Sequence, residues 1–227
     1  MHDKVAGIIW DWNGTLLNDT ELCVQAMNKM LDKRNMKPLS VARYKEVFSF
    51  PVKDYYQKIG FDFLAEPFET PALEFIDHYR KGVNNCQLYE NAMDVLNHFQ
   101  SQGWRQFILS AMEQDALNQC LEEQKITHFF DHVLGLDNHY AASKLENGQR
   151  LIEELNLDVN KLILIGDTVH DFEVARSLGC QCILIANGHQ SRKTLESAGV
   201  QVIDEINQLL QIKSMEQGAR RRERVRK

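Results

Sequence analysis

Five polar side chains stand where the sequence predicts the ends of buried strands, or the segments that follow them. Asp11 ends the apolar run "KVAGIIWD", Ser110 ends "FILS", and Asp167 ends "KLILIGD", with Asp171 four residues later. Lys144 lies in the stretch "AASKLENG". Because the carboxyl ends of parallel strands meet at one edge of a sheet, we expect these side chains to gather there. Such a set offers one carboxylate that can attack, two that help hold a divalent cation, and a hydroxyl and an ammonium group for anionic oxygens.

The elements that must position these residues alternate regularly from about residue 88 onward. Short apolar runs such as "HVLGL", "LILIG" and "QCILIA" alternate with helical patterns such as "EQDALNQCLEEQK" and "FEVARSLG". This alternation predicts βαβ units, and therefore an α/β fold with a parallel sheet that helices cover on both faces. The first apolar run, which ends at Asp11, belongs to the same sheet.

Residues 18 to 85 interrupt this alternation. The stretch "TELCVQAMNKMLDKR" has the apolar periodicity of an amphipathic helix, and three more helical stretches follow, with prolines at their breaks. The sequence thus predicts an all-helical insert after the first strand. A lobe in that position would lie over the carboxyl end of the sheet, where such folds bind ligands.

Composition and charge narrow the class of protein further. The chain has 227 residues, of which 44% are hydrophobic and 26% charged, and no run approaches the roughly 20 apolar residues of a membrane-spanning helix. The N-terminus lacks a signal-peptide pattern and the five cysteines are scattered, so we expect a cytoplasmic protein with reduced thiols and no membrane partner. Residues 213–227 are strongly basic, which predicts a flexible, solvated tail. The rest of the chain is acidic, so nucleic acid is not an expected partner.

The order of these motifs resembles that of a known family. The stretches "DWNGTL", "ILSA", a lone lysine and "GDTVHD" are similar to the four motifs of the haloacid dehalogenase superfamily. The place of the helical insert resembles that in its helical-capped, phosphoglycolate phosphatase-like members. The resemblance covers the chain from about Val5 to Ile212. It implies a Rossmann-like core of residues 1–17 and 86–212, a helical cap of residues 18–85, a bound Mg²⁺ and chemistry through an aspartyl intermediate.

The same resemblance implies a role for each motif residue. Asp11 would be the nucleophile that attacks phosphorus and a ligand of Mg²⁺. Asp167 would ligate Mg²⁺ directly, and Asp171 would support the metal directly or through water. Ser110 and Lys144 would hold the transferring phosphoryl group. The other implied phosphate-binding positions are Gly14, Thr15 and Ala111.

Asn13 departs from the family pattern. Phosphatases of the family usually have a second aspartate there, which protonates the leaving alkoxide and then activates water, while its backbone carbonyl ligates Mg²⁺. Asn13 can supply the carbonyl, but an amide cannot exchange a proton at neutral pH. General acid–base catalysis typically contributes roughly 10²–10⁴-fold to a rate. Hydrolysis of ordinary alkyl phosphates should suffer by about that factor unless another group carries the proton.

Four hypotheses accommodate the asparagine. In the first, another residue carries the proton, and His170 in "GDTVHD" is a candidate because histidine is the usual proton carrier near neutral pH. In the second, the substrates have good leaving groups, as acyl and aryl phosphates do. Alternatively, the protein binds phosphate or a metabolite as a regulatory module without turnover, or it cleaves C–P bonds as a phosphonatase does, through a cap lysine.

We favour the first two, which describe a Mg²⁺-dependent phosphatase of a small phosphorylated metabolite, as a monomer or homodimer. Residues 187–189 after the strand "CILIA" are expected to form a loop without an assigned role.

Overall fold

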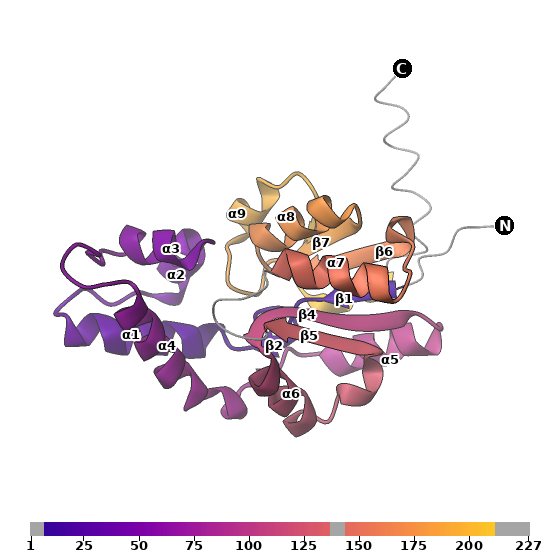
Figure 1. Ribbon diagram of the computed structural model, residues 1–227, viewed down its shortest axis with the longest axis horizontal. Helices are drawn as coiled ribbons and strands as arrows, with labels where there is room; N and C mark the ends of the chain where they lie inside the picture. Colours follow the sequence, from indigo (N-terminus) through magenta and orange to yellow (C-terminus); the bar gives the residue numbers. More distant parts are fainter. Residues whose placement is uncertain (1–6, 137–143, 212–227) are drawn as a thin grey trace, which may run out of the picture.

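A six-stranded parallel sheet forms the centre of the structure, a computed structural model that describes residues 7–136 and 144–211 (Figure 1). The strand order is β5-β4-β1-β6-β7-β8, so the first strand of the chain lies inside the sheet. The strands are β1 (Gly7–Trp10), β4 (Arg105–Glu113), β5 (His132–Leu136), β6 (Leu162–Gly166), β7 (Gln181–Ile185) and β8 (Gln201–Ile203). This arrangement confirms the predicted α/β fold with a parallel sheet.

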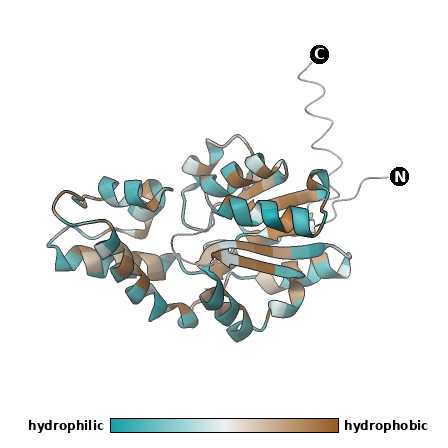
Figure 2. Ribbon diagram, in the orientation of Figure 1, coloured by the Kyte–Doolittle hydropathy of each residue, from teal (hydrophilic) through white to brown (hydrophobic). Residues whose placement is uncertain are grey.

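Successive side chains of β1 enter two different apolar layers, as a strand that is buried on both faces requires. Ile8 and Trp10 belong to one buried cluster, and Ile9 belongs to another. Helices α5 (Ala92–Ser101) and α6 (Gln114–Glu123) cover the first face, while α7 (Lys144–Glu154) and α8 (Val169–Leu178) cover the second (Figure 1). Figure 2 shows the result as apolar strands between helices whose outer faces are polar.

The helical insert follows the first strand, as predicted, and has its own apolar core. Its helices are α1 (Thr20–Lys33), α2 (Val41–Val47), α3 (Val52–Lys58) and α4 (Glu69–Arg80), followed by a 3₁₀ turn at Val83–Asn85. Met27, Tyr44, Tyr55 and Tyr56 are buried in this core, apart from the two layers of the sheet. Figure 1 places the insert beside one end of the sheet.

Some elements differ from the sequence prediction. Strands β2 (Leu17–Asn18) and β3 (Gln87–Leu88) form a two-stranded antiparallel ribbon where the chain leaves the sheet for the insert and returns. Each has two residues, too few to give a period in the sequence. The described part of the chain ends in a 3₁₀ helix, Ile206–Gln211. A short helix α9 (Arg192–Glu196) precedes β8.

The basic tail at residues 213–227 and the start of the predicted first strand lie outside the described residues. In the part of the chain that is described, no helix is long and apolar enough to cross a membrane.

A buried leucine of the sheet provides a test of this core. Leu164 in β6 is fully buried, whereas Leu64 in the insert is fully exposed. We expect Leu164→Ala to lower the free energy of unfolding by about 2–5 kcal/mol, since it leaves a cavity between packed layers. The matched change Leu64→Ala should alter it by no more than about 0.5 kcal/mol. Urea unfolding of both variants measures the difference, and equal losses would contradict the assigned core.

Candidate active site

The neighbouring strands β1 and β6 deliver two carboxylates to the same edge of the sheet. Asp11 follows β1 directly, and its backbone N–H donates to the carbonyl of Ile165 at 2.8 Å, which continues the ladder between the strands. Asp167 follows β6, and Asp171 lies in the first turn of α8. One carboxylate oxygen from each of these three aspartates lies within 4.8 Å of the others, and all three side chains are buried. The structure therefore brings together the three predicted metal-binding carboxylates.

Lys144 is the cation of this cluster. It is the first residue of α7, is buried, and donates from Nζ to Asp11 and, at 2.6 Å, to Asp171. Burial alone would lower the pKa of Lys144, but the charges of Asp11 and Asp171 outweigh it and raise that pKa. The pKa of Asp171 lies below its usual value, since Lys144 and hydrogen bonds from Thr168 outweigh the opposite effect of burial.

The other two carboxylates have too little positive charge around them. Burial raises the pKa of Asp11 to about 6, with Lys144 opposing and Asp171 reinforcing the rise. Burial also raises the pKa of Asp167 to about 8, opposed by His189 and reinforced by Asp11. A divalent cation would supply the missing charge, and these hard oxygen donors are the ligands that Mg²⁺ prefers. The donor set fits such a cation.

Glycines allow the backbone to pack closely on Asp167. Gly14 has φ +74°, and a Cβ atom there would lie 2.2 Å from Asp167 Oδ2. At Gly188 a Cβ atom would lie 2.1 Å from the same oxygen. Thr15 donates from Oγ1 to Asp11 Oδ2 at 3.1 Å, so the turn after β1 also orients the predicted nucleophile. Only a residue without a side chain fits at the two glycine positions.

Ser110 and Ala111 lie in β4, at the same end of the sheet. Ser110 is fully buried, and its Oγ accepts a hydrogen bond from the backbone N–H of Met112 at 3.0 Å. Ala111, Met112 and Asp11 line the cavity, whereas Ser110 is not one of its lining residues. The predicted contact of Ser110 with a phosphoryl group stays a prediction.

The side chain of Asn13 belongs to a polar cluster between the sheet and the insert. Its Nδ2 donates to Asp19 Oδ2 at 2.9 Å and to the Tyr79 hydroxyl at 2.7 Å, and Tyr79 in turn donates to Asp19 at 2.7 Å. Asp19 precedes α1, and Tyr79 lies near the end of α4. Both hydrogen atoms of the amide are therefore engaged by neighbours from the insert.

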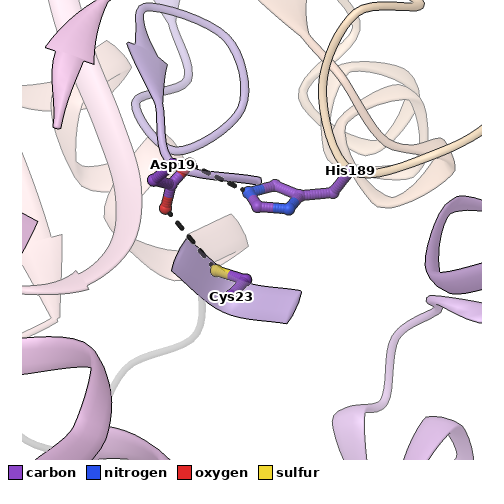
Figure 3. Close-up of side chains that lie close together, drawn as sticks. All are labelled: Asp19, Cys23 and His189. Carbon is purple, nitrogen blue, oxygen red and sulfur yellow. Dashed lines mark hydrogen bonds and ion pairs between the residues drawn. The ribbon is translucent and has the colours of Figure 1, made fainter. Parts of the chain in front are cut away.

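Figure 3 shows the other side of Asp19, where it meets His189 and Cys23. His189 Nε2 lies 3.2 Å from Asp19 Oδ1, and Cys23 Sγ lies 3.8 Å from Oδ2. His189 Nδ1 is 2.9 Å from the hydroxyl of Tyr44 in α2, so both ring nitrogens have partners. Burial would lower the pKa of His189, but Asp19 outweighs it and raises that pKa to about 9. The Asp19–His189 pair joins the start of the insert to the loop after β7.

Sequence reasoning assigned no role to Asp19, Tyr79 or His189. The loop expected at residues 187–189 is present, but its histidine reaches the site. The only signal in the sequence was the position of His189 just beyond a strand end. His170, the predicted proton carrier, lies at the start of α8, where its ring is 4.7 Å from that of Phe50 and its Nδ1 is 3.5 Å from Glu173.

A cavity of about 340 Å³ connects these groups with the insert. Asp11, Asn13, Lys144 and Asp167 line one side, and side chains of α2, α3 and α4 line the other. Concave sites of this size typically bind small molecules. The arrangement offers a buried carboxylate, a paired ammonium group and room for a ligand between them and the insert.

Asn13 and Asp19 provide a test of the polar cluster. An aspartate at position 13 would lose both donated bonds and face the carboxylate of Asp19. We expect Asn13→Asp to lower the free energy of unfolding by about 1–3 kcal/mol, and Asp19→Asn in the same chain to recover part of that loss. Chemical denaturation of the two single variants and the double variant measures their coupling.

Asn84 supplies the matched control for this test. It also donates to a carboxylate, that of Glu123 at 3.0 Å, but on an exposed surface. Asn84→Asp should change the free energy of unfolding by about 0.5 kcal/mol or less. An Asn13→Asp variant as stable as this control would contradict the described cluster.

Comparison with known proteins agrees with this geometry. The chain is 24% identical to a phosphoglycolate phosphatase from Aliivibrio fischeri over 95% of this chain and 99% of that protein. It is 22% identical to the pyrophosphatase PpaX from Bacillus mycoides, over 93% and 98% respectively.

Solved structures show the same fold. One is a haloacid dehalogenase-like family hydrolase from Streptococcus pneumoniae, with a TM-score of 0.70, 20% identity, and coverage of 92% of this chain and 99% of that one. Another is CbbY from Rhodobacter sphaeroides in complex with phosphate, with a TM-score of 0.69, 17% identity, and coverage of 90% and 96%. The family model for haloacid dehalogenase-like hydrolases matches residues 8–185. The chain belongs to the haloacid dehalogenase-like hydrolase family.

Proposed function

We propose that this protein is a Mg²⁺-dependent hydrolase of small phosphate monoesters that uses Asp11 as its nucleophile. The observation that carries the proposal is the buried cluster of Asp11, Asp167, Asp171 and Lys144 at one side of the cavity. The names of the relatives, a phosphoglycolate phosphatase and a pyrophosphatase, support a phosphorylated substrate.

Asp11, Asp167 and the backbone carbonyl of Asn13 would hold Mg²⁺. Both carboxylate oxygens of Asp171 already accept hydrogen bonds from Lys144 or Thr168, so we assign Asp171 a supporting role. When bound, the cation neutralises charge on the phosphoryl oxygens and aligns the reacting groups.

The residues of the chain would carry out the formation and the hydrolysis of a covalent intermediate. The charge of Lys144 opposes the rise in the pKa of Asp11 and so favours its ionised form, in which a carboxylate oxygen can attack phosphorus as the ester P–O bond breaks. The alcohol oxygen leaves with the bonding electrons, and an aspartyl phosphate remains on Asp11. Water then attacks that phosphate, which restores the carboxylate and releases inorganic phosphate.

Asn13 cannot supply the proton that the leaving oxygen needs. Its amide donates hydrogen bonds to Asp19 and Tyr79, but it cannot transfer a proton at neutral pH. Leaving groups of low basicity need little protonation, so acyl and aryl phosphates are favoured over alkyl phosphates. His170 stays a candidate carrier, because its side chain also lines the cavity.

The lysines of the insert support phosphate esters over phosphonates. A phosphonatase needs a cap lysine that reaches the substrate. None of the lysines in the described helical insert lines the cavity. Lys33 pairs with Glu74 at 2.9 Å, and Lys58 donates to Ser49 at 2.8 Å.

Asp11→Asn tests the proposed nucleophile. We expect it to reduce Mg²⁺-dependent phosphate release from acetyl phosphate and phenyl phosphate by at least about 10³-fold, since an amide cannot form the covalent intermediate. Asp94→Asn, which removes a carboxylate from an exposed position of α5, should retain the activity of the unaltered protein. Turnover by Asp11→Asn at the rate of this control would refute the proposal.

The raised pKa values of Asp11 and Asp167 predict how metal removal affects stability. Both exceed the ordinary value of 3.8, so the folded protein binds more protons than the unfolded chain between about pH 4 and pH 8. The raised pKa of His189 acts in the same direction from about pH 6.5 to pH 9. The metal-free protein should therefore lose stability as the pH rises from 5 to 8.

Mg²⁺ should counteract this loss, because it favours the ionised carboxylates. We expect Mg²⁺ to raise the melting temperature more at pH 8 than at pH 5. Thermal unfolding in EDTA and in Mg²⁺ at both pH values checks this prediction. An equal effect of Mg²⁺ at the two pH values would argue against a cation at these carboxylates.

A further inference from the structure

The cavity wall opposite Asp11 is built from apolar side chains. Six of them are Phe48, Phe50, Val52, Tyr55, Phe75 and Ile76, which come from α3, α4 and the segment before α3. On the rim, Arg80 is exposed and Glu113 already accepts hydrogen bonds from the first turn of α6. A small, highly polar substrate such as a phosphorylated hydroxy acid has no apolar group that could pack against this wall.

The aromatic rings of the wall are held in place by one another. The rings of Phe48 and Phe50 lie 5.5 Å apart, and those of Phe48 and Tyr55 lie 5.3 Å apart, both edge to face. On the other side of the wall, Phe75 stacks on Tyr79 with 6.0 Å between ring centroids. These separations are typical of favourable aromatic pairs, so the wall is formed before a ligand arrives.

The wall also keeps apolar surface open to the cavity. Phe50 is 37% exposed, and Phe75 and Ile76 are only half-buried. Burying such surface against a ligand ring is favourable in proportion to the area covered. Because Asp11 and Lys144 line the same cavity, a ligand can place a phosphate on them and an apolar group on this wall.

We propose that the substrates are aryl phosphates, the phosphate esters of phenols, whose ring packs against this apolar wall. The inference rests on the proposed phosphatase function and specifies its substrate class. Two independent features favour that class: the wall binds the ring, and the amide of Asn13 supplies no proton to the leaving oxygen. As the Asp11–phosphorus bond forms, the bond from phosphorus to the aryl oxygen breaks. The aryloxide leaves with the electron pair and takes its proton from water.

Two substrates with similar leaving groups isolate the contribution of the ring. Phenol and 2-naphthol have similar acidity, but naphthyl has a larger apolar surface. We expect kcat/KM with Mg²⁺ to be about five- to tenfold higher for 2-naphthyl phosphate than for phenyl phosphate. Cyclohexylmethyl phosphate, which is apolar but has a basic alkoxide leaving group, should be cleaved at least about 100-fold more slowly than 2-naphthyl phosphate.

Two alanine variants on α4, one in the wall and one outside the cavity, test the contribution of the wall. Phe75→Ala shortens the wall and should reduce the naphthyl-to-phenyl ratio of kcat/KM to about two or less. Leu73→Ala on the same helix changes an exposed side chain outside the cavity and should leave the ratio unchanged. The ratio does not depend on the fraction of folded enzyme, so a loss of stability in either variant does not affect it.

Acetyl phosphate separates failure of this inference from failure of the proposed function. Release of phosphate from acetyl phosphate, with a naphthyl-to-phenyl ratio near one in the unaltered protein, would overturn the substrate class and leave the phosphatase function standing. Equal cleavage of cyclohexylmethyl and 2-naphthyl phosphate would also overturn it. If Mg²⁺ elicits no phosphate release from any of these compounds, the proposed function fails, and the inference with it.

Discussion

The contact of one buried lysine with two buried aspartates is the interaction on which the rest of the structure depends. Lys144 lies between Asp11 and Asp171, with Asp167 close by, in a place that is almost inaccessible to water. Removing charges from water is costly, and only close pairing offsets that cost. Three carboxylates with one ammonium group remain short of positive charge, which is why the pKa values of Asp11 and Asp167 are raised. A cation would therefore be stabilised at these carboxylates, where we propose that phosphate also binds.

The parallel sheet brings the carboxylates of this cluster together, and glycines leave room for them. The adjacent parallel strands β1 and β6 bring Asp11 and Asp167 close together, although the two residues are far apart in the sequence. The backbone around them then has no room for side chains. A Cβ atom at Gly166 would lie 2.3 Å from Cγ of Asp171, and those at Gly14 and Gly188 would collide with Asp167. The short glycine-containing motifs of the sequence thus reflect how tightly the chain closes around its carboxylates.

The sequence predicted those parts of the site that depend on strand order alone. Asp11 and Asp167 could be placed because each ends an apolar run, and parallel strands bring such ends together. The roles of Asp19, Tyr79 and His189 could not be found in this way, since they depend on how the insert docks on the sheet. That docking leaves no period in the sequence, and the two-residue strands β2 and β3, where the chain enters and leaves the insert, are too short to detect. The hydrogen bond from the N–H of Met112 to Ser110 Oγ also leaves no pattern in the sequence, although it joins residues only two apart.

The surroundings of Asn13 give a physical reason for an amide at this position. Its two neighbours are an ionised carboxylate and a hydroxyl that already donates to that carboxylate, so both can only accept a hydrogen bond from it. An amide donates to both, whereas a second carboxylate would oppose the first. The same amide cannot carry the proton for the leaving group in the proposed reaction. A substrate whose leaving group departs as a stable anion removes the need for that carrier, and the apolar wall above Asp11 is the surface that such an aromatic group would cover. The polar cluster and the apolar wall are therefore consistent with a single substrate chemistry.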